Sequence, residues 1–257
     1  MTAIALSRSA SRTPSPGRIL ATFRLHLVNY ETVIVLPWLI MAFIFFVNWM
    51  IWWMVTRSLT SASDLADARE GFGWSGAMFF IFFYMMVVAV QAVNLTFPLA
   101  QGYGVTRRDF YLGTSLTFVA LAVAFSLVLM LLAFLEEATD GWGVGGSMFT
   151  LNYFGGDVWY ERLWMFLVAF LFFFFVGAAT AAIYVRWHTK GMYAFFAVLG
   201  LLVVGSAAVA TLTGTWPAVG EWFVATGVEG LVLWSLAPTA ASAVFGWLIL
   251  RRATPRE

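Results

Sequence analysis

The segment Gly102–Thr114, GYGVTRRDFYLGT, places two arginines and an aspartate between two long apolar regions. Gly102 and Gly104 allow a tight turn, and the hydroxyl of Thr106 can cap a short helix that begins at Arg107. Anchoring of the arginines to lipid phosphate would explain the charge alone. A turn, a cap, an acid and aromatic residues in one loop favour a different interpretation, a short helix that docks into a groove of another protein.

Three amide side chains, Asn48, Gln91 and Asn94, interrupt the apolar regions. Gln91 and Asn94 are three residues apart and so share one face of a helix, whereas Asn48 lies too far along its own segment to meet them readily. Hydrogen bonding between helices, which contributes about 0.6 kcal/mol per contact, is the commoner role of such amides. The alternative is that Asn48, Gln91 and Asn94 line the path of a substrate.

Other chemistry-bearing patterns are missing from the sequence. It has no G-x-x-x-x-G-K-[ST] phosphate loop, no H-E-x-x-H motif and no cysteine. The two histidines, His26 and His188, have no carboxylate nearby in the sequence, and no Ser–His–Asp set can be assembled on one face of a membrane. We therefore predict no catalytic residue, no metal site and no bound cofactor, and hence no enzyme activity in this chain.

The composition identifies the elements that must position these residues. The 257 residues are 62% hydrophobic and 11% charged, which is too apolar for a soluble domain of this size. Because about 20 apolar residues span a bilayer as a helix, the sequence predicts an all-α, single-domain membrane protein with six spans. These are Val33–Val55, Ser75–Phe97, Leu112–Leu135, Leu163–Val185, Gly191–Leu212 and Glu229–Leu250. The interiors of the six predicted spans contain no Asp, Glu, Lys, Arg or His. This argues against a proton-driven carrier but not against a channel.

The basic residues fix the expected orientation. Only Arg57, Arg69 and Arg162 fall on one side of the six spans, and basic residues near span ends stay in the cytoplasm. Both termini and the 98–111 and 186–190 loops are therefore predicted to be cytoplasmic in a multi-pass protein of the inner or plasma membrane. The other side carries the basic residues Arg8, Arg12, Arg18, Arg24, Arg107, Arg108, Arg186, Lys190, Arg251, Arg252 and Arg256.

Several shorter features complete the expected layout. Residues 1–16 are rich in Ser, Pro and Arg and are predicted to be a disordered tail. Gly17–Glu31 has apolar residues at helical spacing and is predicted to be an interfacial helix, the alternative being a frayed start of the first span. Pro98 is expected to end the second span and Pro238 to kink the sixth.

The run FPLAQGYGVTRRDFYLGT resembles the loop between the second and third spans of bacterial ABC-2 type transporter permeases. In that family a segment similar to G-x-[ST]-R-[RK]-x-[FY] forms a coupling helix that fits a cleft of the ATPase subunit. The resemblance covers nearly the whole chain in layout but only about ten residues in motif. The glycine-rich loop at 140–162 has no role in the family pattern. The resemblance assigns the ATPase contact to Gly104, Val105, Thr106, Arg107, Arg108, Asp109, Phe110 and Tyr111.

This resemblance implies a permease subunit of an ATP-driven transporter, more specifically an exporter of a lipid-like or amphipathic substrate. ATP and magnesium would bind to a separate ATPase partner, and a second permease copy or paralogue would complete the substrate path. No nucleic-acid partner is expected. It also implies re-entrant helices between spans 5 and 6, over Thr213–Val228, with Trp216, Trp222 and Phe223 in apolar surroundings. The alternative is a non-transporting accessory or assembly protein of the membrane.

Overall fold

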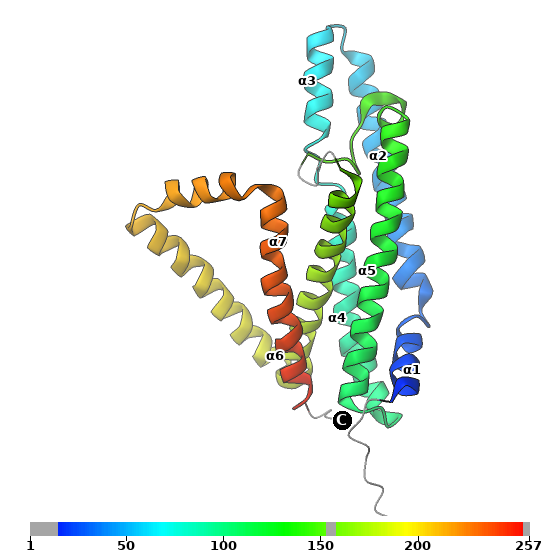
Figure 1. Ribbon diagram of the computed structural model, residues 1–257, viewed down its shortest axis with the longest axis vertical. Helices are drawn as coiled ribbons and strands as arrows, with labels where there is room; N and C mark the ends of the chain where they lie inside the picture. Colours follow the sequence, from blue (N-terminus) through cyan, green and yellow to red (C-terminus); the bar gives the residue numbers. More distant parts are fainter. Residues whose placement is uncertain (1–14, 153–157, 254–257) are drawn as a thin grey trace, which may run out of the picture.

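A computed structural model describes residues 15–152 and 158–253, and within those ranges every regular element is a helix. Figure 1 shows an elongated bundle from which one pair of helices splays outward. The elements are α1 (Pro16–His26), η1 (Glu31–Val35), α2 (Leu36–Ser58), α3 (Ala62–Phe72), α4 (Phe79–Gly102), α5 (Arg107–Ala138), η2 (Gly141–Gly145), α6 (Trp159–Leu212) and α7 (Trp216–Leu250). The predicted tail at 1–16 lies almost wholly outside the described residues.

Five helical segments are long and apolar enough to cross a membrane, which confirms the prediction of an all-helical, multi-pass membrane protein. They are Glu31–Ser58, Phe79–Gly102, Arg107–Ala138, Trp159–Leu212 and Gly230–Leu250. The sequence predicted six, and the difference lies in α6, which contains both the fourth and the fifth predicted spans. At 1.5 Å per residue its 54 residues would extend about 80 Å, far beyond a bilayer core about 30 Å thick.

A break at His188 divides α6 into two arms. The backbone there has φ 54° and ψ −148°, a region that residues with a side chain rarely adopt. Figure 1 shows that the chain turns sharply at this point, so that the second arm leaves the bundle. Many side chains on that arm are exposed, with Leu201 at 74% and Leu212 at 88%. The exposed apolar side chains of this arm therefore need to be covered by something other than its own chain.

The bundle itself is formed by α2, α4, α5 and the first arm of α6, with α1 beside the start of α5 (Figure 1). Stacked phenylalanine rings fill its centre: the rings of Phe118 and Phe174 lie 5.0 Å apart and nearly parallel, and Phe82 lies 4.6 Å from Phe170. Gly177 lets α6 approach α4 closely, because an added Cβ would lie 2.6 Å from the carbonyl oxygen of Met86. Small residues permit such contacts between membrane helices.

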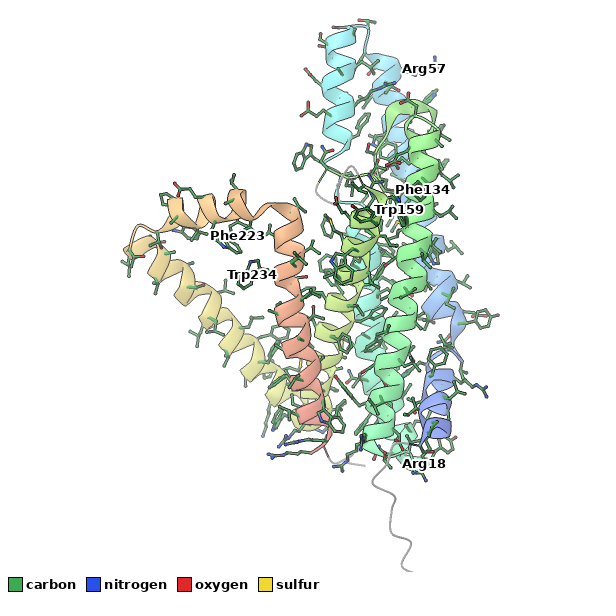
Figure 2. All side chains as sticks on the ribbon, in the orientation of Figure 1. Arg18, Arg57, Phe134, Trp159, Phe223 and Trp234 are labelled. Carbon is green, nitrogen blue, oxygen red and sulfur yellow. The ribbon has the colours of Figure 1, made fainter. Side chains whose placement is uncertain are left out.

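The arginine-rich segments share one end of the molecule. α1, the start of α5, the bend of α6 and the end of α7 all lie at the lower end in Figure 1, whereas α3 lies at the upper end. Figure 2 places Arg18 at the lower end and Arg57 at the upper end. This arrangement agrees with the predicted charge asymmetry, while the orientation in a membrane remains a prediction.

One prediction about prolines was wrong: the helix α4 does not end at Pro98 but continues to Gly102. The helix α7 continues through Pro238 without a break, and the kink expected at that residue remains a prediction. In a helix inside a membrane protein, neighbouring groups can satisfy the hydrogen bonds that a proline removes. The break in α7 lies instead at Gly227, where φ 63° and ψ 178° are accessible essentially to glycine alone.

The segment predicted as re-entrant contains one helical arm. It begins at Trp216 and ends at the Gly227 break, and Figure 1 shows it crossing back from the far end of α6 to the long arm of α7. Trp216 is 52% exposed and Phe223 is 49% exposed, so other parts of this chain do not cover them, and the predicted apolar surroundings remain a prediction. Trp222 contacts Trp234, with ring centres 6.0 Å apart.

Candidate functional site

The turn between α4 and α5 is built as the sequence predicts. The N–H of Val105 donates to Ala100 O at 3.0 Å, and Gly104 adopts φ 74°. The hydroxyl of Thr106 accepts from the N–H of Asp109 at 3.1 Å, which confirms it as the N-cap. One detail was wrong: the helix that begins at Arg107 is not short and separate but is the first turn of α5.

Asp109 is directed into its own chain. Its side chain is buried, accepts from the backbone N–H of Ser15 at 3.3 Å, and lies 3.9 Å from the guanidinium of Arg18. A carboxylate in the first turn of a helix is also stabilised by the helix dipole. Asp109 therefore attaches the start of α1 to the start of α5.

Phe110 is fully buried between α1, α4 and α5. Its ring meets Phe97 edge-on at 5.2 Å and His26 at 5.8 Å. Nε2 of His26 lies 2.8 Å from the hydroxyl of Thr114, and burial lowers the pKa of His26 from 6.5 to about 4. The imidazole is therefore neutral at physiological pH and serves as a hydrogen-bonding group in the core.

Two further motif residues contact α7. The hydroxyl of Tyr111 donates to the carbonyl oxygen of Ala243 at 2.5 Å, and its ring lies 5.4 Å from Trp247. Nη1 of Arg107 donates to the carbonyl oxygen of Arg251 at 2.9 Å. The start of α5 is thus bonded to α1 on one side and to the end of α7 on the other.

The surface that this segment leaves open is small. Tyr103 is 77% exposed, and Gly104, Thr106 and Arg108 are exposed beside it. Val105 is half-buried, as are Arg107 and Tyr111. Of the eight residues assigned to a partner contact, Asp109 and Phe110 have no surface to offer a partner. The sequence could not reveal this, because a partner and the chain's own core both select a buried aromatic side chain.

The three amides lie in different surroundings. Asn48 donates to the carbonyl oxygen of Ile44 in its own helix at 2.9 Å. The buried Oδ1 of Asn94 has no hydrogen-bond partner among the described residues. Gln91 is exposed and lines a cavity between α1, η1, α4 and α5. The structure therefore does not bring the three amides together into one path.

The cavity at Gln91 has a volume of about 110 Å³. Apolar side chains form much of its wall, and His26, Asn29, Thr32, Thr96 and Thr117 add polar atoms to that of Gln91. Sequence reasoning missed all five, because they come from segments up to 91 positions apart. The three threonines show no sequence signal, since threonine is common in membrane helices.

The glycine-rich outer loop is organised around Glu136, which is buried at the end of α5. Its carboxylate accepts from the backbone N–H groups of Met148, Phe149 and Thr150 at 2.9–3.1 Å and from Nε1 of Trp142 at 2.8 Å. In the sequence, Glu136 directly follows the predicted span Leu112–Leu135, and nothing there predicted that it would be buried. Five positive φ values at 140–145 set the shape of the loop, and the chain beyond Asn152 lies outside the described residues until Val158.

Among the described residues, no group of three His, Asp or Glu side chains is placed to hold a metal ion. Comparisons with protein-family models, with curated proteins and with solved structures gave no match. The arrangement of the turn, the cavity and the outer loop is therefore interpreted from the chain itself.

Proposed function

We propose that this chain is the membrane-spanning permease subunit of an ATP-driven transporter of the ABC-2 type. The observation that carries the proposal is the turn before α5: an exposed aromatic residue and a capped, arginine-rich helix start project from the end that holds most of the basic residues. In such an arrangement a cytoplasmic ATPase subunit contacts Tyr103, Gly104, Thr106 and Arg108. ATP and magnesium bind to that partner and not to this chain.

The proposed topology has six spans with both termini in the cytoplasm. The two arms of α6 count as the fourth and fifth spans, and the short arm of α7 lies at the outer membrane surface before the sixth. The break at His188 and the position of Arg186 and Lys190 beside it support this count, because basic residues favour a cytoplasmic turn.

The proposed substrate is lipid-like or amphipathic and leaves the cell. A second permease copy or a paralogue completes the path. The second arm of α6 supports this part of the proposal, since a helix whose apolar side chains are largely exposed offers a surface to another one. The competing function, a non-transporting accessory or assembly protein, needs neither an ATPase nor movement of a substrate.

Vanadate-sensitive ATP hydrolysis tests the proposal. The tagged chain is purified from its native membranes and reconstituted, and the hydrolysis rate is compared with that of Tyr103→Ala. We expect the co-purified activity of the variant to fall by up to roughly thirtyfold, because an aromatic anchor often contributes 2 kcal/mol or more to an interface. Tyr160→Ala is the matched control, since Tyr160 is an exposed tyrosine at the start of α6, away from the turn.

Two results would contradict the proposal. Absence of vanadate-sensitive hydrolysis from the wild-type preparation would favour the accessory protein. Equal activity in Tyr103→Ala and Tyr160→Ala would show that the turn before α5 is not the ATPase contact.

A further inference from the structure

Part of the polar lining of the cavity at Gln91 lies at the depth of hydrocarbon. Gln91 is about 16 Å along α4 from its end at Gly102, and Thr117 is about 15 Å along α5 from its start at Arg107. Both helices are long and apolar enough to cross a membrane. A polar group at this depth has no bulk water to bind and needs a partner from the protein or from a ligand.

Two amides at the cavity lack such a partner. Gln91 and Asn29 are both exposed, and neither side chain forms a hydrogen bond with another described residue. An amide transferred from water to an apolar medium without a hydrogen bond costs several kcal/mol. This cost indicates that a guest molecule supplies the missing donors and acceptors.

The walls around these amides are already fixed by hydrogen bonds. Tyr84 donates to the carbonyl oxygen of Thr32 at 2.9 Å, within the π-helical turn η1, and π-helical turns occur frequently at functional sites. His26 lies 2.8 Å from the hydroxyl of Thr114 on the other side. A ligand would therefore enter a site that is largely formed before it binds, which reduces the entropic cost of binding.

The charge of the lining restricts the ligand. No Asp, Glu, Lys or Arg lines the cavity. His26 adds no charge at neutral pH, because burial lowers its pKa to about 4. An anionic or cationic head would lose its hydration here and gain no counter-charge. Hydroxyl and ester groups, in contrast, match amide and hydroxyl partners.

The size of the cavity restricts the ligand further. A volume of about 110 Å³ corresponds to between three and four water molecules. This is enough for a head of a few heavy atoms, such as a hydroxymethyl or glyceryl group. Leu95 lines the cavity and is 69% exposed, so an attached hydrocarbon chain can leave past it along α4.

We propose that the cavity between α1, η1, α4 and α5 binds the head of an uncharged, hydroxyl-bearing lipid from the cytoplasmic leaflet. Gln91 and Asn29 hydrogen-bond to its hydroxyl and ester oxygens, and the chain lies against Leu95. This site is independent of the proposed transport function, because binding requires neither ATP nor a partner subunit.

Photolabelling tests the site directly. The purified full-length chain in phosphatidylcholine nanodiscs is exposed to an oleoyl monoacylglycerol that carries a diazirine next to its ester. We expect saturable labelling of α4 between Val88 and Thr96 and of the facing part of α5. Unlabelled monoacylglycerol should compete, whereas oleate, which has the same chain and an anionic head, should compete at least about tenfold less well.

Three variants distinguish binding in the cavity from non-specific contact with the surrounding lipid. Gln91→Leu removes the exposed amide, and we expect it to weaken saturable labelling about tenfold, equivalent to roughly one hydrogen bond. Ala92→Phe fills the cavity and should abolish the labelling. Asn48→Leu is the matched control, because its amide bonds to its own helix in α2, away from the cavity.

The outcomes are distinguishable. Labelling that does not saturate, or that Gln91→Leu and Asn48→Leu leave equally strong, would show that only surrounding lipid is being labelled. Equal competition by oleate would show that the hydrocarbon chain alone is recognised and would overturn the proposal. Size-exclusion profiles confirm that the variants fold, and Gln91 is exposed, so its replacement leaves the core intact.

Discussion

Replacement of Glu136 tests how the outer loop is held. Its carboxylate is buried and accepts from the backbone N–H groups of Met148, Phe149 and Thr150, which follow a glycine-rich stretch. The variant Glu136→Ala leaves these donors without an acceptor. We expect the 148–150 segment to detach from α5 while the helix bundle below it remains folded.

The magnitude follows from the number of donors. A hydrogen bond to a charged group contributes about 1.5–3 kcal/mol, and a buried unsatisfied donor costs about 1–3 kcal/mol. With three backbone donors and partial replacement by water, the loop should lose roughly 3–6 kcal/mol of local stability. At about 1.4 kcal/mol per tenfold change, exchange of these amide hydrogens should accelerate by roughly 10²–10⁴.

Hydrogen exchange with mass spectrometry measures this change on the peptide that contains Met148 and Phe149. Glu137→Ala is the matched control: Glu137 is the next residue, is half exposed, and pairs with Arg162 at 2.6 Å. Such a partly exposed pair contributes about 1 kcal/mol or less. Unchanged exchange in Glu136→Ala, or equal acceleration in both variants, would refute this account of the loop.

Three other perturbations give expected outcomes. His26 has a pKa of about 4 in the folded chain, against an ordinary value of 6.5, so between these pH values the unfolded chain binds a proton that the folded chain does not. The free energy of unfolding should therefore fall by up to roughly 3 kcal/mol as the pH drops from 6.5 to 4. Denaturation experiments on His26→Gln should show no such dependence on pH. His188→Gly should raise the unfolding temperature, since it relieves a left-handed backbone worth about 1 kcal/mol or more, and a lower temperature would contradict the strain. Gly113→Ala should destabilise the chain by about 2 kcal/mol, because the new Cβ would lie 2.6 Å from Cβ of Thr22, whereas Gly102→Ala meets nothing within 4 Å and should leave the unfolding free energy within about 0.5 kcal/mol.

The sequence predicted the helices well because hydrophobic length and charge asymmetry are local properties. The cap at Thr106 and the start of α5 follow from neighbouring residues in the same way. Pro98 was misleading, since its effect depends on whether surrounding helices satisfy the freed carbonyl groups. The sharp bend at His188, which joins the fourth and fifth predicted spans, was not visible in the sequence pattern.

The candidate sites were harder to predict, because their residues come from distant segments. His26 joins Thr96 and Thr114, which are 70 and 88 positions away, and no spacing in the sequence encodes that meeting. In the sequence, Glu136 is only the first residue after the predicted span Leu112–Leu135. Its burial follows from the glycine-rich loop that folds over it, which the residue pattern does not reveal.

The charged segment before α5 has two roles that sequence reasoning treated as one. Asp109 and Tyr111 use their polar groups inside the chain, to bond α5 to α1 and to α7, while Tyr103 faces outward. A force applied at the exposed turn therefore cannot displace the start of α5 alone. It must also move α1, through Asp109, and the end of α7, through Tyr111 and Arg107. In the proposed transporter, a small exposed contact would thus reach the N-terminal helix α1 and the last membrane helix together, and the buried residues of the motif would transmit the motion that the exposed ones receive.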